Sequence, residues 1–110
     1  MITKRGQIYW MRLAVSESDG SEQAYTRPCI IIQNDIGNKH SPTVIVAMLT
    51  SKKKNNQPTH CEVKCKGLLK PTTLLAEQIR TIDKKRIGSF IGDCDNMEDV
   101  EKCLRISIGL

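Results

Sequence analysis

Short apolar runs alternate along the chain with polar segments that are rich in turn-forming residues. Residues 29–32 and 43–50 are apolar, β-branched and shorter than typical helices, so each run predicts a buried strand. From 59 to 65, apolar and polar residues alternate, which is typical of a strand with one exposed face. Further strands are expected over residues 6–13, 72–82 and 87–91.

One segment near the C-terminus has helical periodicity. Met97, Val100 and Leu104 follow one another at spacings of three and four, and Asp95 or Asn96 precedes them as a capping residue. This predicts a helix from about residue 96 to about 106. Residues 16–23, 34–39 and 52–58 are polar and predict loops. Several short strands and one late helix favour a small, mostly antiparallel sheet or barrel.

The length and composition fit one folded domain, residues 1–110. No apolar run approaches the roughly 20 residues of a membrane span. The first six residues also lack the apolar stretch of a signal peptide. We therefore expect a soluble cytoplasmic protein without membrane association, in which the five cysteines are reduced.

The net charge of +5 is concentrated in the middle of the chain. Residues 27–70 hold eight Lys and Arg against two acidic residues, whereas residues 71–110 hold six against seven. A concentrated basic surface favours a polyanionic partner such as nucleic acid, although lysine-rich loops that only confer solubility fit equally well. The four aromatic residues are too few for a sheet that stacks several RNA bases.

Metal, histidine and cysteine chemistry have little support in the sequence. In an extended strand Cys61 and Cys65 would lie about 13 Å apart, too far for a shared zinc ion, so both are expected to face the core. His40 and His60 are better explained as surface histidines than as an acid–base pair. Cys29 is expected to be buried rather than nucleophilic. Since no paired carboxylates stand out either, we expect neither a metal nor a cofactor.

The remaining candidates for an active site are polar residues at two strand ends. Arg27 begins a strand, and Thr50 and Ser51 end another just before three consecutive lysines. A guanidinium can donate two parallel hydrogen bonds to a phosphate, and a threonine hydroxyl can add a further donor. Taken alone, these residues are explained better as a solvated strand-edge cation and ordinary strand-end groups.

Several short motifs occur in a fixed order along nearly the whole chain. The most specific is Glu-Gln-Ile-Arg-Thr-Ile-Asp-Lys at 77–84. The others are Lys-Arg-Gly-Gln-Ile-Tyr at 4–9, Gly-Ser-Glu-Gln at 20–23, Arg-Pro at 27–28, Ile-Gln-Asn-Asp at 32–35, Ser-Pro-Thr at 41–43, Val-Ala-Met-Leu-Thr at 46–50, Pro-Thr-His at 58–60 and Ser-Ile-Gly-Leu at 107–110. Together they resemble the MazF/PemK/Kid family of bacterial toxin endoribonucleases.

The resemblance implies a mainly β fold, an SH3-like plasmid-maintenance-toxin barrel of antiparallel strands with a C-terminal α-helix. It implies a homodimer, neutralised by a cognate MazE-like antitoxin, that cleaves single-stranded RNA (typically mRNA) sequence-specifically and without a metal. The family's catalytic arginine falls on Arg27 and its catalytic threonine on Thr50. Substrate-binding residues are then expected at Ser21, Gln23, Ser51, Lys52, Lys53, Lys54 and Gln78.

Two departures from the family pattern leave the catalytic pair intact. Gln7 stands where members often carry aspartate, and residues 24–26 stand where they often carry glycines. The second departure affects the loop in which base preference is expected. Fold does not fix function, so two rivals remain: a non-catalytic toxin of the same fold that inhibits a protein such as DNA gyrase, and an RNA-binding regulator without activity.

Overall fold

One antiparallel sheet and the helices that flank it make up the described part of the chain, residues 2–14, 24–52 and 56–110 of a computed structural model. The strands are hydrogen-bonded in the order β4-β5-β3-β2-β1-β6. None of the described helices is long and apolar enough to cross a membrane. Along the chain the elements are β1 (Gln7–Ala14), β2 (Ala24–Ile31), α1 (Asp35–His40), β3 (Thr43–Thr50), β4 (His60–Glu62), β5 (Thr73–Asp83), the 3-10 turn η1 (Lys84–Arg86), β6 (Ile87–Asp93) and α2 (Met97–Ile108).

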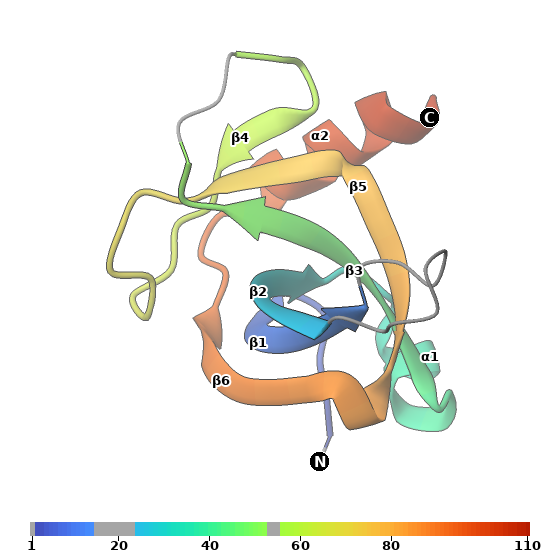
Figure 1. The fold of residues 1–110 in the computed structure, drawn as a ribbon. Coiled ribbons are helices and arrows are strands. Elements are labelled where there is room, and N and C mark those ends of the chain that lie inside the picture. The colour runs from blue at the N-terminus through green and yellow to red at the C-terminus, as the bar shows by residue number, and fades with distance from the viewer. Residues whose placement is uncertain (1, 15–23, 53–55) are drawn as a thin grey trace, which may run out of the picture.

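The sheet curls strongly, and β5 is the strand that bends most (Figure 1). In the pairing of β3 with β5, Ala47 is opposite Ile79 but Met48 is opposite Leu75, so residues 76–78 form a bulge. Bulges of this kind increase local twist and bend a strand. The predicted antiparallel architecture with a late helix is confirmed. The predicted barrel needs a correction, because β4 and β6, at the two ends of the described sheet, are not hydrogen-bonded to each other.

The strand predicted at 59–65 is wrong in length, because β4 is only three residues long. Asn96, at the start of α2, donates from Nδ2 to the Glu62 carbonyl at 2.7 Å, and its Oδ1 accepts from Lys64 N–H at 2.8 Å. The Asn96 side chain thus pairs with two backbone groups at and just after the end of β4. His60 also differs from expectation: its side chain is only 7% exposed, and Nε2 lies 3.0 Å from Oε2 of Glu77.

Two apolar clusters lie on opposite faces of the sheet. Successive residues alternate between them, so Ile30 packs with the cluster under α2 whereas Ile31 packs with the cluster enclosed by the curl. The predicted helix is confirmed as α2, which buries Val100, Cys103 and Leu104 against the first cluster. Cys61, Cys65 and Cys94 pack against this cluster too, as expected for the first two.

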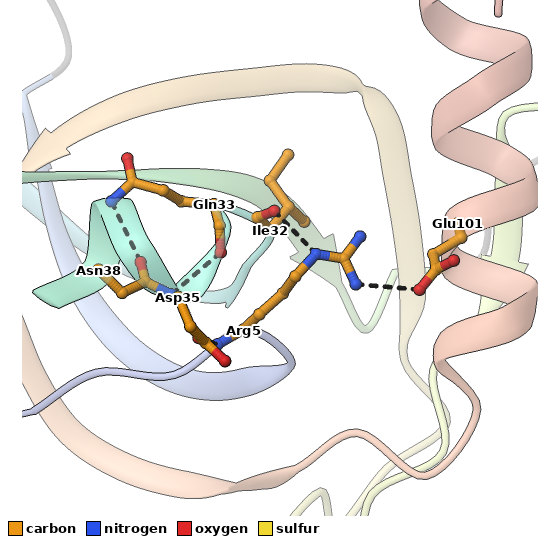
Figure 2. Close-up of polar contacts among 6 residues, drawn as sticks. All are labelled: Arg5, Ile32, Gln33, Asp35, Asn38 and Glu101. Atoms are coloured by element: carbon orange, nitrogen blue, oxygen red, sulfur yellow. Dashed lines mark hydrogen bonds and ion pairs between the residues drawn. The ribbon is translucent and has the colours of Figure 1, made fainter.

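The segment at 34–39, predicted as a loop, instead forms the cap and most of the short helix α1. The Asn34 side chain caps it by accepting from Gly37 N–H at 2.8 Å. Asn38 is 1% exposed and exchanges hydrogen bonds with Gln33: Nδ2 donates to its carbonyl at 2.9 Å, and Oδ1 accepts from its Nε2 at 3.1 Å. These contacts, rather than an apolar stripe, hold the helix (Figure 2).

Arg5 links this region to α2 (Figure 2). Its backbone N–H donates to Oδ1 of Asp35 at 2.8 Å, and its Nε donates to the Ile32 carbonyl at 3.1 Å. Its Nη1 forms an ion pair with Oε1 of Glu101 at 3.0 Å. The N-terminal segment is therefore fixed to both helices, and β1 begins two residues later.

Candidate active site

A cleft of about 560 Å³ opens beside the end of β3, next to the neighbouring strands β1 and β2. β6 and the segment between β4 and β5 contribute the rest of its lining. The lining residues are Trp10, Arg27, Pro28, Leu49, Thr50, Ser51, Lys52, Gly67, Leu68, Leu69, Lys70, Thr72 and Ile91.

Arg27 reaches this cleft from β2 and is partly buried. Its Nη2 donates to the backbone carbonyl of Leu49 at 3.3 Å, and its guanidinium carbon lies 6.0 Å from the ring centroid of Tyr25. A cation at this distance from an aromatic face is at the outer limit of a cation–π contact. The contact with β3 holds the guanidinium beside Thr50, the next residue along that strand.

Thr50 is the last residue of β3 and is only 5% exposed. Its Oγ1 accepts a hydrogen bond from the backbone N–H of Lys52 at 3.2 Å. A hydroxyl that accepts one bond still carries a proton to donate. The local turn therefore orients the Thr50 hydroxyl at the cleft wall and brings Ser51 and Lys52 to the same rim.

The opposite wall is built from the segment before β5. A side chain at Gly67 would come within 1.9 Å of the Ile91 carbonyl oxygen, so only glycine allows this segment to lie directly against β6. Leu68 N–H donates to the carbonyl of Cys65 at 3.1 Å, which makes a tight turn. This close packing brings Leu68, Leu69 and Lys70 to the cleft.

The cleft is electropositive. Arg27, Lys52 and Lys70 line it, and among the residues that the structure describes, none that lines the cleft is acidic. All three cations come from the basic middle of the chain, which agrees with the charge distribution in the sequence. Clefts lined by charge of one sign concentrate ligands of the opposite sign, so this surface suits a phosphodiester.

The structure brings together four of the predicted site residues: Arg27, Thr50, Ser51 and Lys52. Gln78 lies exposed on β5 and is not among the lining residues. Ser21, Gln23, Lys53 and Lys54 lie outside the described residues, as does most of the loop in which base preference was expected.

Sequence reasoning did not single out Trp10, Leu69 or Lys70 as site residues. The strand pattern carried a signal for Trp10, because neighbouring residues of a strand point to opposite faces. Trp10 therefore faces away from the side on which Tyr9 and Met11 lie. For Leu69 and Lys70, the decisive contact is the tertiary one that Gly67 makes with Ile91. No local pattern predicts that their segment packs against β6.

Cys29 lies on the same face of β2 as Arg27 and is fully buried, as predicted. Burial raises the pKa of the Cys29 thiol from 9.0 to about 12, although Arg27 and Arg80 act in the opposite direction. Its Sγ lies 3.7 Å from the sulfur of Met48. A protonated, enclosed thiol is a poor nucleophile. The described residues contain no group of three or more His, Cys, Asp or Glu side chains placed to hold a metal ion.

The fold is shared with solved structures of toxins and their complexes. The chain matches an endoribonuclease from a mycobacterial species, solved in complex with its cognate antitoxin, with a TM-score of 0.82 and 23% identity over 98% of this chain and 96% of that one. It also matches a chain of the MazE–MazF complex from Deinococcus radiodurans, with a TM-score of 0.76 and 17% identity over 100% and 98% of the two chains. At these identities the likeness defines the class of fold.

Sequence similarity identifies the family as well as the fold. The family of PemK-like, MazF-like toxins of type II toxin–antitoxin systems matches residues 4–108. The chain is also 46% identical, over 115 aligned residues, to the endoribonuclease EndoA of Bacillus subtilis (strain 168), covering 100% of this chain and 97% of that protein. The chain therefore belongs to the PemK-like, MazF-like toxin family.

Proposed function

We propose that this protein is an endoribonuclease toxin that cuts single-stranded RNA, typically mRNA, at specific sequences in the cleft around Arg27 and Thr50. Family membership and the similarity to a protein named endoribonuclease support the activity. The observation that carries the site assignment is the hydrogen bond from Arg27 Nη2 to the Leu49 carbonyl, which places the guanidinium beside Thr50 in a cleft lined by further cations.

The reaction is an internal transfer of the phosphate. The 2′-oxygen of the substrate forms a bond to the adjacent phosphorus, the bond from phosphorus to the 5′-oxygen breaks, the 2′-hydroxyl loses its proton and the departing 5′-oxygen gains one. Arg27 donates hydrogen bonds to the phosphoryl oxygens as negative charge builds up on them, and Thr50 donates another. The products are a 2′,3′-cyclic phosphate, which can open to a 3′-phosphate, and a 5′-hydroxyl.

This chemistry requires RNA, because DNA has no 2′-hydroxyl. It also proceeds without a metal or cofactor, since the attacking group belongs to the substrate and the charge stabilisation comes from side chains. Lys52 and Lys70 bind flanking phosphates. The other predicted contacts, Ser21, Gln23, Ser51, Lys53, Lys54 and Gln78, are proposed to bind the substrate around the scissile position.

The protein acts in the cytoplasm as a homodimer and is neutralised by a cognate MazE-like antitoxin. Support for the antitoxin comes from relatives of the same fold that were solved in complex with one. The exposed apolar side chains of Ile106, Ile108 and Leu110, at the end of α2, provide a surface that an assembly can bury.

Incubation of the purified protein with a long RNA in EDTA, followed by mapping of the new ends, tests this function. The expected result is cleavage at a short recurring sequence, with 5′-hydroxyl ends. A toxin that acts on a protein such as gyrase would leave the RNA intact and unbound. An inactive RNA-binding regulator would retard the RNA on a gel without cutting it.

A further inference from the structure

Trp10 stands on β1 at the edge of the cleft, directly opposite Pro28 of β2, the residue that follows Arg27. Its neighbours Tyr9 and Met11 are buried, at 5% and 0% exposure, whereas Trp10 remains 43% exposed. Tryptophan side chains are highly buried on average, so this exposure is unusual for one that only fills a core. This indole instead presents a large aromatic surface beside the candidate catalytic arginine.

The backbone around Trp10 is closely packed. A side chain at Gly88 of β6 would come within 2.7 Å of the Trp10 carbonyl oxygen, so the two strands lie against each other at this point. On the other side, Trp10 is held in the β1–β2 ladder by its pairing with Pro28. The indole therefore projects from a backbone that is held on both sides.

The surroundings of the indole match the two parts of a nucleotide. Leu68, Leu69 and Ile91 supply apolar surface in the same cleft, and Leu69 is 96% exposed. Arg27 and Lys70 supply positive charge in that cleft. A flat aromatic ring with apolar walls suits a base, and the cations suit the phosphate attached to it.

We propose that Trp10 stacks on a nucleobase next to the phosphate held by Arg27, and that Leu68 and Leu69 enclose this base on its other side. This inference rests on the proposed function, since it assigns a base-binding position to the same cleft. Base–aromatic stacking tolerates different sequences, because every base has a π-face. Trp10 therefore contributes binding at this position, and the apolar rim contributes selection by size.

Fluorescence tests the proposal directly, because Trp10 is the only tryptophan in the chain. The probes are a mixed-sequence single-stranded 2′-deoxyoligonucleotide, which cannot be cut, and an abasic phosphodiester chain of the same length. Both are expected to bind, as measured by the anisotropy of a terminal dye. Only the probe with bases is expected to quench the tryptophan emission, since stacking requires a base.

Matched substitutions separate stacking from general loss of apolar surface. Trp10→Leu should weaken binding of the deoxyoligonucleotide by roughly 5- to 140-fold, the range for loss of one base–aromatic stack. Phe90→Leu changes an aromatic residue of similar exposure (52%) on β6, outside the cleft lining, and should bind normally. With RNA, Trp10→Leu should raise KM and leave kcat nearly unchanged, as expected for uniform binding.

The inference is overturned if the deoxyoligonucleotide binds without changing the emission. It is overturned also if the deoxyoligonucleotide does not bind, the result expected if the cleft rim docks an apolar peptide instead. It is overturned equally if Trp10→Leu cuts the same RNA with the wild-type KM, a result that leaves the nuclease function intact. Conversely, base-dependent quenching by a wild-type protein that never cuts RNA would support the base site and refute the nuclease.

Discussion

The Arg27 guanidinium lies 3.3 Å from the backbone carbonyl oxygen of Leu49, the residue that precedes Thr50. The bond joins the Arg27 side chain on β2 to the backbone of β3 at one wall of the cleft, although 22 positions separate Arg27 from Leu49 in the chain. The same hydrogen bond fixes the position of the guanidinium in the cleft, and this group is a permanently charged donor.

Replacing Arg27 by alanine should reduce the single-turnover rate of RNA cleavage by at least about 10²- to 10³-fold, the usual cost of removing one donor to a developing oxyanion. Arg27→Lys should recover little of this loss, since an ammonium keeps the charge but lacks the planar fork. Circular dichroism and urea denaturation should show that both variants fold. Normal cleavage by a folded Arg27→Ala protein would rule out the assigned role.

At Thr50, which is 5% exposed, valine removes the hydroxyl and keeps nearly the same side-chain shape. Thr50→Val should lower kcat on the order of 10²-fold through loss of the hydroxyl donor. Thr50→Ser keeps the hydroxyl and its bond from Lys52 N–H, so it should retain most of the activity. Equal activity of the valine and serine variants would show that the hydroxyl takes no part in the reaction.

Lys52 and Lys70 should bind phosphates without reading sequence. In the double variant with alanine at both positions, the slope of log K against log salt concentration should fall by about 1.4, since each phosphate contact on a single strand contributes about 0.7. The cleavage sequence should not change. Lys39→Ala is the matched control, because this exposed lysine lies in α1, outside the cleft lining. An unchanged slope in the double variant would place the RNA backbone elsewhere.

The buried thiol of Cys29 should make the free energy of unfolding depend on pH. The buried thiol has its pKa raised from 9.0 to about 12, so the native protein keeps this proton while the unfolded chain releases it above pH 9. The contribution of the Cys29 thiol to the free energy of unfolding is therefore fully present below pH 9 and is lost as the pH rises toward 12. Between pH 9.5 and 10.5 the advantage of wild type over Cys29→Ala in free energy of unfolding should shrink by about 1 kcal/mol.

Thiol alkylation provides an independent check of the same burial. At pH 8 without denaturant, mass spectrometry should find Cys29 unmodified after treatment with iodoacetamide, whereas it should react fully in urea. Rapid labelling of Cys29 in the native protein would contradict its enclosure between β2 and β3 and revive it as a candidate nucleophile.

Strands and α2 were predictable because their signals are local. The short β-branched apolar run at 43–50 predicted β3, and the helical spacing of Met97, Val100 and Leu104 predicted α2. α1 was missed because its stability comes from tertiary contacts: Asn38 is hydrogen-bonded to Gln33 in the interior, and no apolar repeat marks the segment.

The candidate catalytic pair could be named only through family motifs, since the sequence around Arg27 and Thr50 fits ordinary strand ends. The structure corrects this for Arg27, because β2 begins at Ala24 and only Thr50 ends its strand. Three features were beyond any local pattern. The Asn96 side chain bonds the backbone at the end of β4, the bulge at residues 76–78 bends β5, and the close approach of Gly67 to Ile91 brings its segment to the cleft. Each depends on residues that meet only after the chain has folded.

In the proposed mechanism, the cleft around Arg27 and Thr50 cleaves RNA with the substrate's own 2′-hydroxyl. The most direct test is a short RNA, containing one mapped cleavage site, in which only the nucleotide on the 5′ side of the scissile phosphate is changed to 2′-deoxy. In EDTA, this substrate is expected to bind with nearly the affinity of the all-RNA control and to remain uncut at that phosphate. Cleavage of the deoxy-substituted position at the control rate would contradict it.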